Sequence, residues 1–182
     1  MVRHARPAIT PDAPPRDWPL APDASVADLA AAAVLPAQAT WFTSPEPKAR
    51  QTAALLTDTP VQVLEELAET GRDGQALPAE QFEQTVSDYL TAGEAPAGWE
   101  SRVDATLRIV NTAQAAMEMT EDGDCVLVGH GTAFTLLVAA LAGRPPDAAA
   151  WRAMRMPDHC ELRPGAGGAF EVVSPWGGWV ST

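Results

Sequence analysis

The sequence has few of the features that mark secreted, membrane-bound or metal-caged proteins. Its only cysteines are Cys125 and Cys160, too few for a disulfide framework or a thiolate metal cage, so we expect two buried thiols. It has no run of about 18 apolar residues, so no transmembrane helix is expected. The start, MVRHARPAITPDAPP, lacks the apolar core of a secretory signal. These absences lead us to expect a cytoplasmic protein.

Basic residues are also scarce. The chain has 12 Lys and Arg against 24 Asp and Glu, a formal net charge of −12. Such a charge repels nucleic acid and anionic membranes, so we expect neither as a partner. It also opposes small anionic substrates. Any phosphate chemistry must therefore depend on a local cluster of cations against the acidic background.

Strand-like and helix-like segments alternate along the chain. Short apolar runs at 39–43, 60–64 and 124–128 predict strands, and the tail at 159–173 predicts a β-hairpin around PGAGG. Longer segments predict helices at 25–35, 48–56, 79–92, 99–119 and 132–143, with Ser25 and Ser44 as N-caps and Gly93 as a stop. This alternation predicts one α/β domain over residues 1–182, a three-layer α/β/α sandwich with a mainly parallel central sheet.

Residues suited to catalysis follow the expected strands. Arg3-His4 stands at the start, the segment 44–53 (SPEPKARQTA) follows one strand, and 129–132 (GHGT) follows another. In open α/β sheets, ligands bind outside the carboxyl ends of the strands. We therefore expect these three segments to meet in one site.

The same segments resemble the histidine phosphatase superfamily, also called the phosphoglycerate mutase-like family. VRHARP is similar to its opening Arg-His-Gly motif, and SPEPKARQTA to its Ser-Pro-x-x-x-Ala-x-Gln-Thr-Ala helix start with a phosphate-binding Arg. VLVGHGT is similar to its second His-Gly motif, and LAETG at 67–71 to its acidic Leu-x-Glu pattern. The motifs occur in the family's order over almost the whole chain.

The resemblance implies a metal-independent, cofactor-free phosphatase that acts on a small phosphorylated substrate. His4 would attack a phosphate monoester and carry the phosphoryl group as a phosphohistidine intermediate. Arg3 and Arg50 would clamp the non-bridging oxygens, and His130, cationic beside the phosphate, would add a third donor. Glu69 would protonate the leaving alkoxide and then activate water, which requires a raised pKa for Glu69 and therefore partial burial.

Several departures from the family keep alternatives open. Ala5 replaces the usual Gly after His4, which is tolerable only at negative φ. Only two residues precede Arg3, so the first strand is either clipped or begins downstream of its natural start. The local sequence AETGRDG lacks the mutases' Glu-Arg-x-Tyr-Gly stretch, which favours a hydrolase. A phosphohistidine protein phosphatase and a catalytically idle phosphate-binding module remain alternative functions. Within the site, a Glu near Glu69 could be the acid, and Arg72 could be a substrate contact or a surface charge. The oligomeric state stays open.

Overall fold

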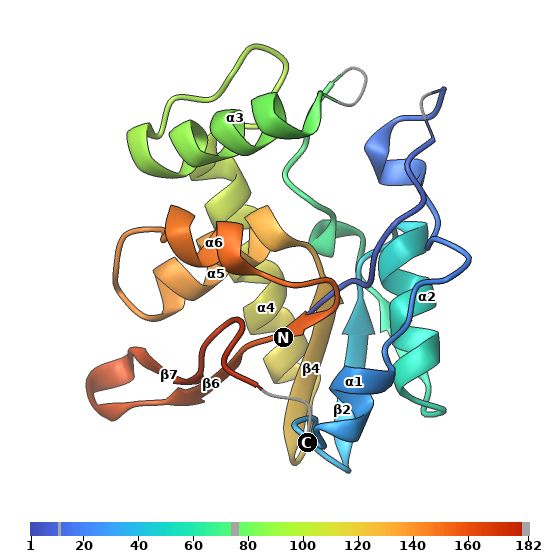
Figure 1. The fold of residues 1–182 in the computed structure, drawn as a ribbon. Coiled ribbons are helices and arrows are strands. Elements are labelled where there is room, and N and C mark those ends of the chain that lie inside the picture. Colours follow the sequence, from blue (N-terminus) through green and yellow to red (C-terminus); the bar gives the residue numbers. More distant parts are fainter. Residues whose placement is uncertain (11, 74–76, 180–182) are drawn as a thin grey trace.

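A central sheet organises the protein. The computed structural model describes residues 1–10, 12–73 and 77–179 (Figure 1). The sheet has the strand order β3-β2-β4-β1-β5. Its strands are β1 (Val2–Arg3), β2 (Ala39–Thr43), β3 (Val61–Val63), β4 (Asp124–Gly129) and β5 (Asp158–His159). Neighbouring strands are parallel except for β5, which runs antiparallel to β1. The predicted mainly parallel sheet is confirmed.

Helices cover both faces of this sheet. They are α1 (Ala27–Ala31), α2 (Pro47–Leu56), α3 (Ala79–Ala92), α4 (Arg102–Glu118), α5 (Gly131–Leu141) and α6 (Ala148–Ala153). Alternate residues of a strand point to opposite faces. Trp41 and Val126 thus pack in one apolar cluster with α1 and α2, while Phe42 and Leu127 pack in another with α3, α4, α5 and α6. Figure 1 shows these two helical layers on either side of the strands.

Some element boundaries differ from the sequence prediction. The helix expected at 25–35 is only Ala27–Ala31, and it buries Leu29 alone. High alanine propensity did not extend it, because helices in proteins are stabilised mainly by the face that they pack. The expected N-cap at Ser44 is also wrong, since α2 is capped at Glu46 and has Pro47 as its first residue. Gly93 does end α3, with a left-handed φ of 81°.

The predicted C-terminal hairpin divides between two sheets. Asp158 and His159 pair with β1 in the central sheet. The hairpin itself is β6 (Glu161–Pro164) and β7 (Phe170–Ser174). The short strand β1 therefore lies between two partners, the parallel strand β4 and the antiparallel strand β5.

The register of the sheet brings three strand ends together. Arg3 of β1 pairs with Gly129 of β4, and Thr43 of β2 pairs with Val128. The backbone N–H of His4 donates to the Gly129 carbonyl at 2.9 Å, and that of Ser44 donates to the Val128 carbonyl at 3.0 Å. The residues that follow β1, β2 and β4 therefore begin at the same edge of the sheet.

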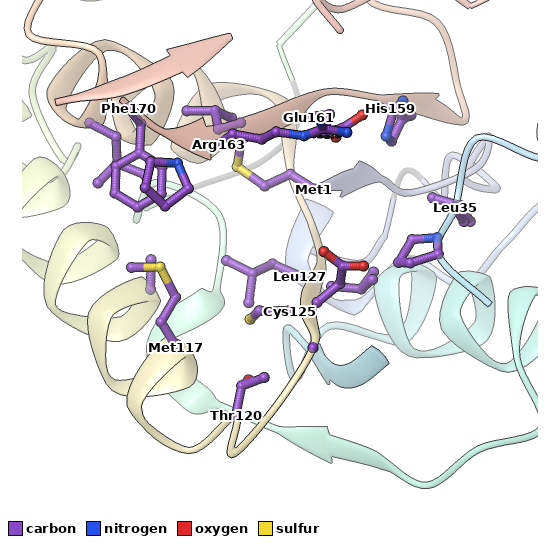
Figure 2. Close-up of a pocket in the computed structure, with 18 of the residues that line it drawn as sticks. Met1, Leu35, Met117, Thr120, Cys125, Leu127, His159, Glu161, Arg163 and Phe170 are labelled. Atoms are coloured by element: carbon purple, nitrogen blue, oxygen red, sulfur yellow. Dashed lines mark hydrogen bonds and ion pairs between the residues drawn. The ribbon is translucent and has the colours of Figure 1, made fainter. Parts of the chain in front are cut away.

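A cavity lies at the amino end of β4, away from the edge where these three strands end. It has a volume of about 650 Å³ between the amino half of β4, the last turns of α4 and the β6–β7 hairpin. Figure 2 shows Met117, Cys125, Leu127 and Phe170 around it. It contains none of the site residues predicted from the sequence. Within the described residues, no helix has the length and apolar character needed to cross a bilayer.

Candidate active site

Two histidines predicted to act together lie side by side at the carboxyl edge of the sheet. His4 directly follows β1 and His130 directly follows β4. Their ring centroids are 5.2 Å apart with an interplanar angle of 61°. The side chains are 6% and 0% exposed, respectively. Residues 126 positions apart in the sequence thus share one small buried volume.

The His4 ring is held in a single orientation. Its Nδ1 lies 2.8 Å from the carbonyl oxygen of Ala5, as expected for a nitrogen that carries the proton and donates. Burial lowers the pKa of His4 well below its usual value, and His130 adds to the effect. The imidazole is therefore neutral, with its lone pair on Nε2. This is the protonation state that a nitrogen nucleophile requires.

The segment after His4 is fixed by helix α2. The Ala5 N–H donates to Thr52 Oγ1 at 2.9 Å, and that hydroxyl donates to the Lys48 carbonyl at 2.7 Å. Among the described non-glycine residues, only Ala33 has a positive φ. Ala5 therefore meets the condition under which its methyl group is tolerated, and it lies fully buried.

His130 is embedded among polar groups of the segment after β2. Its Nε2 is 2.7 Å from Ser44 Oγ and 3.5 Å from Glu46 Oε1. Its Nδ1 is buried and has no hydrogen-bond partner among the residues described. Burial lowers the pKa of His130 to about 3, although Glu69 opposes this shift. His130 is therefore neutral in the absence of phosphate, not cationic, and would gain a proton only with an added anion.

Glu69 lies at the N-terminus of α5. Its Oε1 accepts from the backbone N–H groups of Ala133 at 2.8 Å and Thr70 at 2.9 Å, and its Oε2 accepts from Thr132 at 3.2 Å. The partial burial expected from the sequence is present. Burial alone would raise the pKa of Glu69, but His130, Arg72 and the two shorter hydrogen bonds lower it to about 2. The expected raised pKa is therefore wrong for the unliganded site, because His130, Arg72 and the backbone donors together outweigh the effect of burial.

The Arg3 side chain borders the same site. Its Nη1 donates to the Met154 carbonyl at 3.0 Å, while its Nε is buried without a partner among the described residues. A Cβ at Gly131 would lie 3.2 Å from Arg3 Nε. Glycine at this position therefore leaves room for the guanidinium, and Arg3 keeps a donor free for an anion.

Arg50 differs from the other predicted site residues in its exposure. Its side chain is exposed on α2, whereas Lys48, two residues earlier, is only 6% exposed. Two residues in a helix are about 200° apart around its axis, so these side chains point in nearly opposite directions. Lys48 shares the buried face with Ala49, Thr52 and Ala53. That small and apolar stripe was the signal by which the sequence could have favoured Lys48.

The charge of the Lys48 ammonium acts on both imidazoles of the site. Its Nζ donates to the Pro15 carbonyl at 2.8 Å and forms an ion pair with Glu46. After burial, the charges of Lys48 and Arg3 are among the causes that lower the pKa of both His4 and His130. Lys48 is thus a candidate for the phosphate-binding role predicted for Arg50.

An open cavity adjoins this cluster. Its volume is about 320 Å³, and Glu46, Glu69 and Arg72 are among its lining residues. The Arg72 guanidinium lies 4.5 Å from the centre of the Phe82 ring and 5.6 Å from that of Trp99. Of the two interpretations that the sequence left open for Arg72, the structure favours a contact within the site, because these rings hold its charge at the cavity wall.

The family is decided by a match along nearly the whole chain. The family model of the histidine phosphatase superfamily (branch 1) matches residues 1–173. The chain belongs to this superfamily. No curated protein matches the sequence.

Solved structures agree with this assignment to the histidine phosphatases. A mycobacterial glucosyl-3-phosphoglycerate phosphatase is 27% identical, with a TM-score of 0.73 over 97% of this chain and 96% of that one. A protein described as mycobacterial hydrolase 1 is 26% identical, with a TM-score of 0.72 over 97% and 96%. A phosphoserine phosphatase variant from Entamoeba histolytica is 15% identical, with a TM-score of 0.68 over 96% and 93%, and shows the fold alone. Together with the family, the first of these supports phosphatase activity for this protein.

The buried imidazoles of this histidine phosphatase predict a loss of stability in acid. Burial lowers the pKa values of His4, His130 and His159 below the usual 6.5, to about 3 for His130 and about 4 for His159. Between these values and 6.5, the unfolded chain binds protons that the folded protein does not, so the free energy of unfolding falls as the pH falls. At about pH 5, His130 and His159 would each cost up to roughly 2 kcal/mol, and His4 acts in the same direction.

This acid dependence is measurable by urea unfolding from about pH 7.5 down to about pH 5. Replacing His130 by Gln should reduce the change of the free energy of unfolding with pH, because the uncharged amide does not titrate. A free energy of unfolding that stays constant over this range would contradict neutral buried histidines.

Proposed function

We propose that this histidine phosphatase hydrolyses a small phosphate monoester through a phosphoryl group carried on Nε2 of His4. The observation that supports this most directly is the contact between His4 Nδ1 and the Ala5 carbonyl, which leaves a neutral Nε2 beside His130. The nearby cations Arg3 and Lys48 would bind the non-bridging oxygens. They supply the local positive charge that an acidic chain needs in order to attract phosphate.

In the first step, the Nε2 lone pair of His4 attacks phosphorus and the bond to the ester oxygen breaks. The leaving alkoxide takes a proton from Glu69. The dianionic substrate supplies negative charge that opposes the lowered pKa of Glu69, so the carboxyl gains a proton as the substrate binds. The positive charges of Arg3 and Lys48 stabilise the transferring phosphoryl group.

In the second step, water attacks the phosphoryl group and the nitrogen–phosphorus bond breaks. Glu69, now a carboxylate again, accepts the proton from the attacking water. The negative charge of the phosphoryl group on His4 opposes the lowered pKa of Glu69, which makes the carboxylate a stronger base toward this water. Inorganic phosphate then leaves, and His4 returns to its neutral form.

The proposal predicts hydrolysis of an aryl phosphate that a chelator does not reduce, because side-chain cations supply the charge stabilisation. Turnover would be measured with and without ethylenediaminetetraacetate, and a quenched reaction would be searched by mass spectrometry for an acid-labile phosphoryl group on the peptide that contains His4. Loss of turnover with the chelator, restored by a divalent metal, would contradict metal independence. Tight phosphate binding without turnover would instead favour the idle phosphate-binding module.

A further inference from the structure

The carboxylate of Glu46 lies among the groups to which we assign phosphate binding. Its Oε1 is 3.5 Å from Nε2 of His130, and its Oε2 forms an ion pair with the Lys48 ammonium. Glu46 is 7% exposed and Lys48 is 6% exposed. A buried carboxylate thus already pairs with one of the cations that a phosphate would need and lies beside His130. Glu46 is not among the site residues predicted from the sequence.

Two hydrogen bonds hold Glu46 in this place. Its Oε1 accepts from the Glu69 N–H at 2.9 Å, and its own N–H donates to Ser44 Oγ at 3.2 Å. The same Ser44 hydroxyl contacts Nε2 of His130 at 2.7 Å. Glu46 is also the N-cap of α2, where Pro47 begins the helix. The position of the carboxylate is therefore built into the local structure.

The Glu46 carboxylate reduces the positive charge of the site. Arg3, Lys48 and Arg72 supply positive charge, while Glu69 and Glu46 offset two of these three cations. Glu69 interacts with backbone N–H groups of α5, so its charge is already compensated by a helix end. Glu46, in contrast, is paired directly with a phosphate-binding ammonium. An incoming phosphate must compete with it for Lys48.

We propose that Glu46 sets the affinity of the active site for phosphate by occupying Lys48 in the free enzyme and giving it up when phosphate binds. This inference rests on the proposed function, since it takes the site to be a phosphate site. A weaker hold on phosphate favours release of the product after each turnover. Glu46 is thus a positioning residue for Lys48 and a limit on product inhibition.

The experiment titrates inorganic phosphate into the wild-type protein and into Glu46→Gln, with binding followed by calorimetry. Glutamine keeps the size of the side chain and an oxygen that accepts from the Glu69 N–H, but it removes the charge. Because a unit charge about 4 Å away acts strongly in a buried site, we expect phosphate to bind about 10- to 100-fold more tightly to the variant. The inhibition constant for phosphate in aryl phosphate hydrolysis should fall by a similar factor.

The matched control is Glu65→Gln, which removes an acidic charge from an exposed side chain on the neighbouring segment. We expect it to leave phosphate affinity within about twofold of the wild type, because exposed charges are screened. Unchanged or weaker phosphate binding by Glu46→Gln would overturn the inference while leaving the proposed function in place. Absence of phosphate binding by both the wild type and Glu46→Gln would overturn both.

A second measurement needs no variant. In isotopically labelled wild-type protein, the carboxyl carbon resonance of Glu46 should move when phosphate is added, because its ion pair with Lys48 is broken. The resonance of Glu65 should stay in place. A Glu46 signal that does not change at saturating phosphate would also overturn the inference.

Discussion

Replacing His4 by alanine is expected to abolish aryl phosphate hydrolysis, with a loss of at least about 10⁴-fold in kcat. The variant lacks the nitrogen that forms the bond to phosphorus, and the described neighbours His130 and Glu69 are already engaged with Ser44 and with backbone N–H groups. Steady-state turnover with an aryl phosphate measures the loss. The phosphoryl group on the peptide containing residue 4 should disappear with it.

The matched control for this prediction is His159→Gln. His159 is another buried imidazole, 3% exposed, but it lines the cavity at the opposite end of the sheet. Both substitutions disturb a buried histidine, so both can lower the unfolding temperature, but only His4→Ala should stop turnover. Undiminished turnover in His4→Ala would refute the assignment of the nucleophile.

The second large effect is expected on helix α2, where two neighbouring basic residues should behave differently. Lys48→Ala should lower kcat/KM by about 10²–10³-fold, because it removes a buried charge aimed at the transferring phosphoryl group. Arg50→Ala should change kcat/KM by less than about twofold, because the Arg50 side chain is exposed and its charge is screened by solvent. The comparison uses the same assay and the same helix, so a general effect of removing positive charge cancels.

The two variants also distinguish the sequence-based assignment from the structural one. A large loss in Arg50→Ala together with a small loss in Lys48→Ala would contradict the orientation of α2 in this structure. Lys48→Arg provides a further check. It keeps the charge but changes the shape, and we expect it to retain more activity than Lys48→Ala if its charge is what binds phosphate.

The sequence by itself determined the sheet and the pair of histidines. Short apolar runs followed by residues 44–53 and by Gly129-His130 indicated parallel strands with reactive residues at their carboxyl ends. This could be deduced because parallel strands in register end at one edge, so a residue directly after each strand has only one region to occupy. The boundaries of α3 and its stop at Gly93 were equally local properties, since a left-handed glycine ends a helix wherever it stands.

Only the tertiary structure decided which charges reach the site and in what state. Lys48 and Arg50 lie on different faces of α2. Which of these faces is buried depends on the orientation of the helix, and the packing of Ala49 and Ala53 against the sheet sets that orientation. The Glu46 carboxylate pairs with Lys48 where residue 46 is the extended N-cap of α2 and Pro47 begins the helix. The pKa of Glu69 falls to about 2 because the fold places His130, Arg72 and backbone N–H groups around its carboxylate, and these outweigh its burial. Such effects depend on distances and burial between segments far apart in the chain, and a linear pattern does not contain them.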